Sequence, residues 1–529
     1  MKKPNLQYRF LEILPGALVL VTLVVSAVLS FVHPLWVVFF VLAFDLYWLF
    51  RVVHFVFYLT LSWRRYRRAI ATDWPSKLAV LPDWREVTHL IFLPTYKESY
   101  EVVAETFRSL SQSRYPRDKM AIVLAGEERD KDNFLSISSR IKSEFEDKFL
   151  KLFITIHPAG LPDEIPGKGS NLNFAGHAIK TEIRALGTDE EKIIVSTFDI
   201  DTIVHQDYFS ALTVAYLENP NPTRSSYQPI AFYNNNIWES PAIVRIAAFG
   251  TTYWLMAELM RPERLVTFSS HSMSWKALLD VDFWQKDIVS EDSRIFLQCF
   301  MHYNGDYRTT PIYLPVSMDT VAGDKGYFQS LKDLYKQHRR WAWGVENFPY
   351  LVSNFLKRPG IPLWKKIKYS WYDLEGRYTW ATAAIFISIL GRLPFYVARG
   401  DVRELSIFQN APIILGWIMT AAMIGILVSA ALMPFILVRR PAEKSAFSWL
   451  IMFLQWAVLP VSLIIFGSLP AIDAQTRLML GKYLGFNVSP KVRKQEIAVP
   501  ARINVMPTPS RSLLLRTMSQ LSSRFKVKS

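Results

Sequence analysis

Five apolar runs, two at the start of the chain and three near its end, constrain the fold more than any other feature. The first two extend from about Leu11 to Val32 and from about Leu35 to Leu61, and each is long enough to cross a bilayer. The later candidates are Trp380–Val397, Ile413–Leu437 and Phe447–Leu469. Half of the 529 residues are hydrophobic and only 20% are charged, which is typical of membrane spans joined to a soluble domain.

The distribution of Lys and Arg predicts how the chain crosses the membrane. Lys2 and Lys3 precede the first run and "SWRRYRRA" follows the second, so by the positive-inside rule residues 1–63 form a hairpin with cytosolic flanks. The first run has no small-residue cleavage site, which favours an anchor over a signal peptide. Three later spans, over 380–470, would leave the basic tail outside, so we expect one of them to be re-entrant or interfacial. Both termini are then cytosolic, in a protein of the cell membrane.

The net charge of +15 is concentrated in the tail. From Lys491 to the end, the sequence has nine Lys and Arg residues and one acid, Glu496, a net charge of +8. Next to membrane spans such a tail fits an anionic lipid surface, so we expect membrane lipids as partners and no nucleic acid. The one cysteine, Cys299, excludes an internal disulfide and favours a buried structural thiol.

Between residues 72 and 363, short apolar runs alternate with amphipathic segments. The runs "HLIFLPTY", "MAIVLAGE", "LFITIHP" and "KIIVSTFD" are typical of strands, and segments such as "SYEVVAETFRSLSQS" fit helices. This alternation predicts a cytosolic α/β domain with a mainly parallel sheet. Residues 364–379 mix aromatic side chains with lysines and predict a helix in the membrane interface, and 471–529 form the tail.

Three D-x-D pairs occur in the chain: Asp130/Asp132, Asp199/Asp201 and Asp280/Asp282. The first lies in a charged run and the third beside a helix-like segment, where a turn or a helix start explains them. Only Asp199 and Asp201 end a continuous apolar strand, and ligands bind beyond the carboxyl ends of parallel strands. Two carboxylates there predict an oxygen site for Mg²⁺ or Mn²⁺ that bridges a diphosphate; an ordinary strand-end turn is the alternative.

The stretch "IVSEDSRIF" is a second candidate. Ser290, Glu291 and Asp292 are equally typical of the polar start of a helix, where acids are favoured. As a functional group, Asp292 would be a general base that removes a proton from an attacking hydroxyl.

The stretch "YKQHRRWAWG" is a third. Gln337, Arg340 and Trp341 share one helix face, and offer an amide, a planar fork for phosphate oxygens and a flat surface for a sugar ring. An amphipathic or interfacial helix is the alternative. Two weaker signals are "LPTYKES" after the first soluble strand and "PGKGSNLN", in which two glycines flank Lys168 before a helix.

The order "PTYKE", "KGSNLN", "FDIDT", "SED", "QHRRW" resembles the membrane-embedded family 2 glycosyltransferases, which include cellulose, hyaluronan and chitin synthases. The resemblance covers about Asp83 to Gly344 with the flanking spans. In addition, "FNVSPK" resembles the F-x-V-T-x-K gating loop of cellulose synthase, with Phe486, Val488, Ser489 and Lys491 at the motif positions.

The resemblance implies a GT-A-like (Rossmann-related) domain inserted between transmembrane helices. Asp199 and Asp201 would hold the metal and the donor diphosphate, and Asp292 would be the base of a single inverting displacement. The nucleotide pocket would be lined by Thr95, Tyr96, Glu98 and Lys168. The acceptor and diphosphate side would be formed by Gln337, Arg340 and Trp341, together with Glu291 and His271.

Two departures from the family pattern concern specificity. Where relatives carry an Asp after the second strand this chain has "LAGEERD", so Glu127 or Glu128 is the candidate for the base contact. Where F-x-G-T is common, this chain has "FSSHSMSW". Ser270, His271 and Ser272 are therefore candidates for sugar contacts, with His271 expected to hydrogen-bond and a general-acid role as its alternative.

These features predict an inverting, metal-dependent transferase that moves sugar from a nucleotide-diphosphate donor, most simply a UDP-sugar, to a growing β-glycan and secretes the product as it grows. One alternative is the transfer of a single sugar to a lipid-linked acceptor. A non-catalytic transporter or scaffold is the other, although the complete carboxylate set argues against it.

Overall fold

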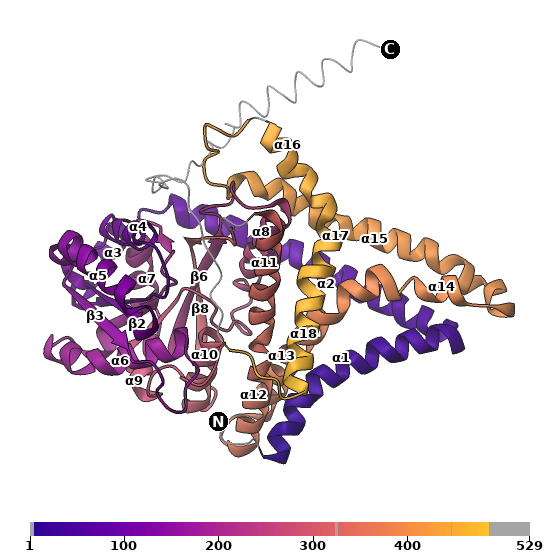
Figure 1. Ribbon diagram of the computed structural model, residues 1–529, viewed down its shortest axis with the longest axis horizontal. Helices are drawn as coiled ribbons and strands as arrows, with labels where there is room; N and C mark the ends of the chain where they lie inside the picture. Colours follow the sequence, from indigo (N-terminus) through magenta and orange to yellow (C-terminus); the bar gives the residue numbers. More distant parts are fainter. Residues whose placement is uncertain (1–4, 323–325, 446, 486–529) are drawn as a thin grey trace, which may run out of the picture.

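The computed structural model describes residues 5–322, 326–445 and 447–485. Figure 1 shows two parts, an α/β domain and a group of long helices. The motif expected as a gating loop, residues 486–491, lies outside the described residues.

An eight-stranded sheet forms the centre of the α/β domain, in the order β3-β2-β1-β4-β7-β6-β8-β5. β3, β2, β1 and β4 are parallel and β6 is parallel to β8, whereas β7 is antiparallel to both β4 and β6, and β5 to β8. The expected mainly parallel α/β domain is thereby confirmed. The strands are β1 (Thr88–Pro94), β2 (Met120–Glu127), β3 (Lys151–His157), β4 (Ile193–Thr197), β5 (Ile203–Val204), β6 (Ser225–Tyr233), β7 (His271–Ser274) and β8 (Arg308–Met318).

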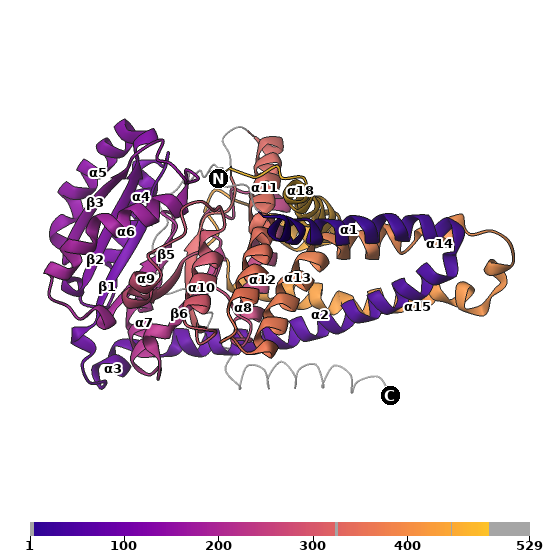
Figure 2. The ribbon, with the colours of Figure 1, turned by 90° about the horizontal axis from the view of Figure 1, so that it is seen from below.

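Helices cover both faces of the parallel strands, as Figure 2 shows. Successive side chains of a strand point to opposite faces, so Ile91 of β1 enters one apolar core and Phe92 enters the other. Both faces must be apolar because the crossover helices bury both, and this explains the unbroken apolar runs. One face is covered by α4 (Tyr100–Ser111), α5 (Lys131–Phe145) and α7 (Tyr208–Leu217), and the other by α6 (Lys168–Ala185), α9 (Trp275–Asp280) and α10 (Glu291–His302).

Within the described residues, five helical segments are long and apolar enough to cross a membrane: Leu6–Val32, Pro34–Ala71, Leu363–Val397, Ser406–Phe435 and Phe447–Met479. They comprise α1 (Leu6–Val32), α2 (Pro34–Ala71), α13 (Leu363–Ile385) with α14 (Leu393–Val397), α15 (Ser406–Leu432), and α16 (Phe447–Leu454) to α18 (Leu469–Met479) through α17 (Leu459–Ser462). In Figure 2, α1, α2, α14 and α15 project away from the sheet. The segment 364–379, expected as a separate interfacial helix, is part of the continuous α13.

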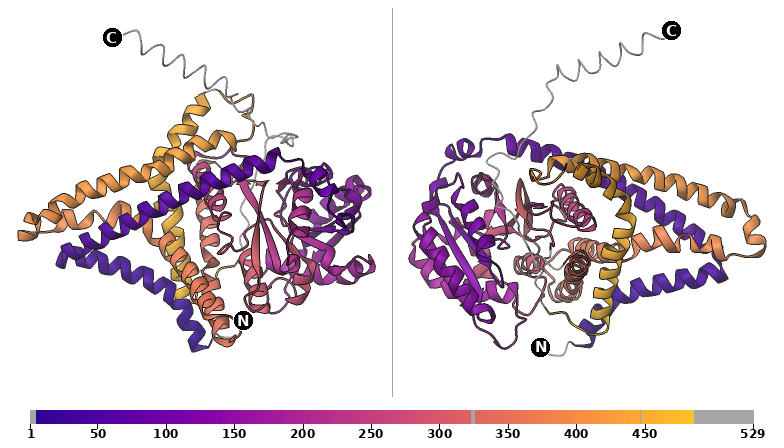
Figure 3. Two further views of the ribbon diagram at one scale, coloured as in Figure 1. Left: turned by 180° about the vertical axis from the view of Figure 1, so that it is seen from behind. Right: turned by 45° about the horizontal axis from the view of Figure 1, so that its top comes forward.

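A layer of helices joins the sheet to the projecting helices. α2 packs on α8 (Ala242–Glu258), α8 packs on β6, and α11 (Tyr327–Ala342) packs on α18. Leu59 and Tyr66 of α2 are buried in the same apolar cluster as Phe232 of β6. Figure 3 shows α2, in indigo, extending from the projecting helices to the α/β domain. The face of the sheet beside β6 and β8 therefore adjoins the helices that can enter a membrane.

Candidate active site

The middle D-x-D pair lies at the carboxyl edge of the sheet. β4 ends at Thr197, and the Phe198 amide donates to the Phe92 carbonyl (3.1 Å), so the chain leaves the sheet just before Asp199. The Asp199 side chain is 32% exposed. In contrast, Asp130 and Asp280 lie at the start of α5 and the end of α9, as expected for the two other pairs.

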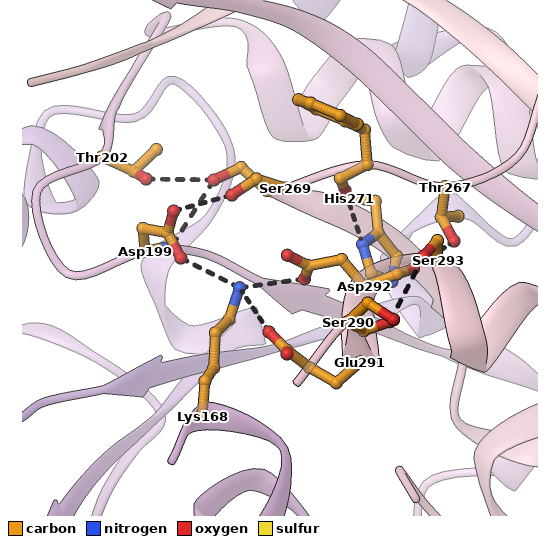
Figure 4. A network of polar contacts seen from close by, with 12 residues as sticks. Lys168, Asp199, Thr202, Thr267, Ser269, His271, Ser290, Glu291, Asp292 and Ser293 are labelled. Atoms are coloured by element: carbon orange, nitrogen blue, oxygen red, sulfur yellow. Dashed lines mark hydrogen bonds and ion pairs between the residues drawn. The ribbon is translucent and has the colours of Figure 1, made fainter. Parts of the chain in front are cut away.

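Lys168 connects the first carboxylate of the D-x-D pair to the E-D acids. Its Nζ lies 2.9 Å from Asp199 Oδ1, 2.9 Å from Asp292 Oδ1 and 3.5 Å from Glu291 Oε1, as Figure 4 shows. Lys168 is the first residue of α6, and a Cβ on Gly169 would lie 3.1 Å from Glu291 Cβ. The glycine therefore allows α6 and α10 to begin side by side, which brings these groups together.

The charges of this cluster are unevenly balanced. Burial by itself would lower the pKa of Lys168, but Asp199, Asp292 and Glu291 together raise it well above its usual value. Burial, followed by the charge of Asp292, raises the pKa of Glu291 to about 8, although Lys168 and Arg340 oppose this. At pH 7 Glu291 is therefore protonated and neutral. The carboxyl groups of Asp199 and Asp292 then outnumber the single ammonium group of Lys168, so the cluster favours the binding of a further cation.

The segment before β7 supports the carboxylates from the opposite side. Ser269 Oγ donates to Asp199 Oδ2 (2.7 Å). His271 is fully buried, its Nδ1 lies 2.9 Å from the Phe268 carbonyl, and its Nε2 has no hydrogen-bond partner within the described residues. Burial lowers the pKa of His271, so the ring is neutral. Because Nδ1 must donate to the carbonyl, Nε2 is left as an acceptor. Figure 4 places His271 beside Asp292.

Two serines that were candidates for sugar contacts bond within the protein. Ser270 and Ser272 are fully buried. The Ser270 hydroxyl lies 3.2 Å from Thr202 Oγ1, and the Ser272 hydroxyl lies 2.8 Å from Ser196 Oγ and 3.1 Å from the Tyr208 hydroxyl. These bonds hold residues 270–272 against β4, the loop after it and α7.

Asp201 lies inside the domain. The residue is 1% exposed, and its Oδ2 accepts a hydrogen bond from the Asp319 amide (2.9 Å). Its carbonyl accepts one from the Asn235 side chain (3.1 Å). The two carboxylates of the pair therefore have different surroundings: Asp199 faces the cluster, whereas Asp201 ties the loop after β4 to the ends of β6 and β8.

Three of the expected acceptor residues, Gln337, Arg340 and Trp341, lie on α11. Trp341 is half-buried, and its ring centroid lies 5.7 Å from that of Tyr233 and 6.4 Å from that of Phe268. Arg340 influences the pKa of Glu291, and Gln337 is half-buried one turn earlier on the helix.

Sequence reasoning did not identify Tyr233. This residue ends β6 and is 9% exposed. Burial, followed by the charges of Asp199 and Asp292, raises its pKa. Together with the contact to Trp341, this places Tyr233 between the carboxylates and the acceptor helix. Its position as the last residue of an apolar strand was the available signal.

Three of the expected nucleotide residues, Thr95, Tyr96 and Glu127, lie at the ends of β1 and β2. Arg129 joins them: it forms an ion pair with the buried Glu127, and its guanidinium lies 4.6 Å from the Tyr96 ring centroid. Thr95 is buried and its amide donates to the Ala125 carbonyl (2.8 Å). Sequence reasoning missed Arg129.

The two remaining candidate residues of this region contact other segments. Glu128, the alternative to Glu127, accepts a hydrogen bond from the Ala159 amide (2.8 Å). The Glu98 carbonyl accepts one from the Asn133 side chain (3.2 Å).

Comparisons with known proteins identify the class. Residues 194–472 match the family model described as glycosyl transferase family group 2. Among solved structures, a mannosyltransferase from Pyrobaculum calidifontis in complex with GDP-Man and Mn²⁺ is 16% identical with a TM-score of 0.43, and the match covers 84% of this chain and 100% of that one. Residues 1–349 of TarS from S. aureus, in complex with UDP-GlcNAc, are 12% identical with a TM-score of 0.33, and the match covers 76% and 94%. No curated protein matched.

The matched range begins in β4 and ends in α18, so it includes Asp199, Asp292 and α11. It spans just over half of the 529 residues. The expected GT-A-like α/β domain, flanked by helices apolar enough to span a membrane, is confirmed. The chain belongs to glycosyl transferase family group 2 and is a glycosyltransferase.

Proposed function

We propose that this protein is an inverting, metal-dependent membrane glycosyltransferase of the cellulose, hyaluronan and chitin synthase type. It uses a nucleotide-diphosphate sugar, most simply a UDP-sugar, to extend a β-glycan processively and secretes the product as it grows. The observation that carries the proposal is the position of Lys168, 2.9 Å from both Asp199 and Asp292. Asp199, which is suited to a metal-bound diphosphate, and Asp292, which is suited to act as a base, are thus neighbours.

The residues at the D-x-D pair fit Mg²⁺ or Mn²⁺. No set of three or more His, Cys, Asp or Glu side chains suited to a metal occurs in the described ranges. Such ions are, however, commonly held by one or two carboxylates, while substrate phosphates and water complete the coordination. The partly exposed Asp199 suits this role, with Asp201 behind it. The bound ion would neutralise charge on the departing diphosphate.

The placement of the side chains supports a single displacement. Asp292 takes the proton from the acceptor hydroxyl as its oxygen attacks the anomeric carbon. The bond from that carbon to the diphosphate breaks on the opposite side, which inverts the configuration. The diphosphate is expected to draw Lys168 and Arg340 towards itself, which frees Asp292 to accept the proton. Trp341 and Tyr233 offer aromatic faces on which the acceptor sugar can pack.

The first test is Asp292→Asn, with Asp282→Asn as a matched control. Asp292→Asn keeps the shape of the side chain but removes its basicity, so transfer should fall at least 1,000-fold while donor binding stays within about threefold. The Asp282 side chain is 82% exposed and belongs to a D-x-D pair outside the site, so its variant should behave as the parent. Normal turnover by Asp292→Asn would refute its role as the base.

The contact of α11 with α18 supports processive synthesis. Trp341 lies on a helix that packs against a candidate span, so a product leaving the site could pass directly to the membrane helices. The alternative function is the addition of one sugar to a lipid-linked acceptor. Membranes supplied with a panel of radiolabelled donors distinguish the two, because mass analysis gives either a polymer series or a single increment.

We propose a multi-pass cell-membrane location with cytosolic termini. The proposed parts are a hairpin (1–63), a catalytic domain (72–363), an interfacial segment (364–379), a C-terminal bundle (380–470) and a tail (471–529). The native Cys299 is buried, so single cysteines introduced elsewhere can be labelled selectively in intact cells. Labelling of the tail by an impermeant maleimide from outside would refute this topology.

A further inference from the structure

Glu346 lies at the junction between the acceptor helix and the E-D acids. It is the last residue of the 3₁₀ turn η7 (Trp343–Glu346), which follows α11 and precedes α12 (Asn347–Lys357). Its Oε1 accepts hydrogen bonds from the Val289 amide (3.3 Å), the Ser290 amide (3.1 Å) and Ser290 Oγ (2.8 Å). Its Oε2 accepts one from Trp343 Nε1 (2.9 Å).

Through three of these four bonds, the Glu346 side chain holds residues 289 and 290, which lead into α10. Ser290 precedes α10 but makes no side-chain cap bond to it. Its amide and hydroxyl bond instead to Glu346, one residue before Glu291 and two before Asp292. Four donors converge on the two carboxylate oxygens of Glu346. Burial raises the pKa of Glu346, and Arg294 together with the bonds from Ser290 and Trp343 opposes this rise. The position of the E-D acids therefore depends on a residue about fifty positions later in the chain.

A second set of bonds fixes the same helix to α12. Arg294 Nε donates to Asn347 Oδ1 (2.8 Å), and Arg294 Nη2 donates to the Glu346 carbonyl (3.1 Å). Asn347 Nδ2 donates to Ser293 Oγ (2.8 Å). The first turn of α10, which carries Asp292, is thus held by both the side chain and the backbone of Glu346.

Trp343, which bonds to Glu346, is also linked to the first long apolar helix, α1. The Trp343 ring contacts the edge of Tyr483, with centroids 6.4 Å apart and planes at 85°. The Tyr483 hydroxyl lies 3.0 Å from the Glu12 carboxylate of α1. Trp343 follows Trp341 by two residues, so its bond to Glu346 and its ring contact with Tyr483 lie next to the expected acceptor residues.

We propose that Glu346 is a positioning residue for catalysis, which holds residues 289–290 so that Asp292 faces the acceptor hydroxyl. This role rests on the proposed function of Asp292. Glu346 does not contact the substrate in this proposal; it acts by holding Ser290, the residue that precedes Glu291 and Asp292.

The test compares Glu346→Gln with the parent in the full-length protein. A glutamine has one oxygen and one NH₂ group, so it can serve either Ser290 or Trp343 but not both. The kcat should fall 10- to 100-fold while the donor KM stays within about threefold. Trp343→Phe removes the Nε1 donor together with part of the buried indole, but leaves the bonds from residues 289 and 290 to Glu346, so it should lower kcat less. Asp207→Asn is the control, because Asp207 is also a buried carboxylate but pairs with Arg114, which is no part of the cluster.

A double variant separates positioning from general stability. If Glu346 acts only through Asp292, adding Glu346→Gln to Asp292→Asn should not lower the residual transfer further. Should Asp292→Asn retain full turnover, the proposed function is wrong whatever Glu346 does. Inactive Asp292→Asn with a fully active Glu346→Gln would overturn the positioning role alone. Equal losses in kcat, donor affinity and melting temperature for Glu346→Gln would also overturn it, since they would indicate misfolding.

Discussion

Glu291 allows a direct test of the electrostatics of the cluster. Its side chain is 4% exposed and lies 3.5 Å from Lys168 Nζ. Burial, followed by the charge of Asp292, raises its pKa to about 8 from 4.5. Glu291→Gln keeps the size of the protonated side chain and its capacity to donate, but it cannot ionise. The substitution therefore isolates the effect of the buried acid.

The expected change in stability follows from the two pKa values. Between about pH 4.5 and pH 8 the native protein holds a proton on Glu291 that the unfolded chain has released, so stability falls as the pH rises through this window. The slope is at most about 1.4 kcal/mol per pH unit. From pH 4.5 to pH 7 the carboxyl therefore lowers the unfolding free energy by up to roughly 3 kcal/mol. Glu291→Gln should abolish this pH-dependent decrease in the unfolding free energy.

Two measurements check this expectation. Melting temperatures of the detergent-solubilised protein should rise on substitution at pH 7 but change little at pH 5, whereas Glu146→Gln, on a side chain 53% exposed, should change neither. The donor KM of the parent should increase from pH 7 to pH 9 as Glu291 ionises beside the diphosphate site, and that of Glu291→Gln should increase less. A variant that is destabilised equally at both pH values, or inactive at pH 7, would show that Glu291 acts as a carboxylate and would refute the reasoning.

Two further substitutions test the neighbours of Glu291. Lys168→Met removes the cation between Asp199 and Asp292, so transfer should fall more than 100-fold and donor affinity should fall with it; turnover within tenfold of the parent would rule out a role for the ammonium group. Tyr233→Phe keeps the ring against Trp341 but removes the hydroxyl, and the loss of one hydrogen bond of about 1.4 kcal/mol lowers kcat/KM for the acceptor about tenfold. An unchanged acceptor titration, measured at saturating donor, would exclude the Tyr233 hydroxyl from the site.

The parts of the fold that depend on local pattern could be predicted from the sequence. The four apolar runs became β1 to β4, because strands buried on both faces need unbroken apolar residues. The position of Asp199 followed from the end of one such run. The boundary expected at residue 379 is crossed by α13, because aromatic and lysine residues continue a helix as readily as they begin one.

Contacts between distant segments could not be predicted in the same way. Lys168 was expected in the nucleotide pocket, yet it bridges acids that lie 31 and 124 positions away, a result of how α6 and α10 pack. Arg129, Tyr233 and Glu346 belong to no motif, and their roles appear only when separate strands and helices are brought together. The inward orientation of Asp201 likewise depends on the end of β8, which the D-x-D spacing does not encode.

The length of α2 has a mechanical consequence. Its 38 residues form one helix about 57 Å long, roughly twice the thickness of a hydrocarbon core. The end near Tyr66 is packed on the α/β domain, and the other end lies among the projecting helices. With the projecting helices in a membrane, as proposed, α2 would act as a rigid link that sets the height of the candidate active site above the bilayer. A thicker or thinner bilayer would then change the tilt of α2, so a change in lipid chain length would shift the candidate catalytic groups relative to the membrane surface.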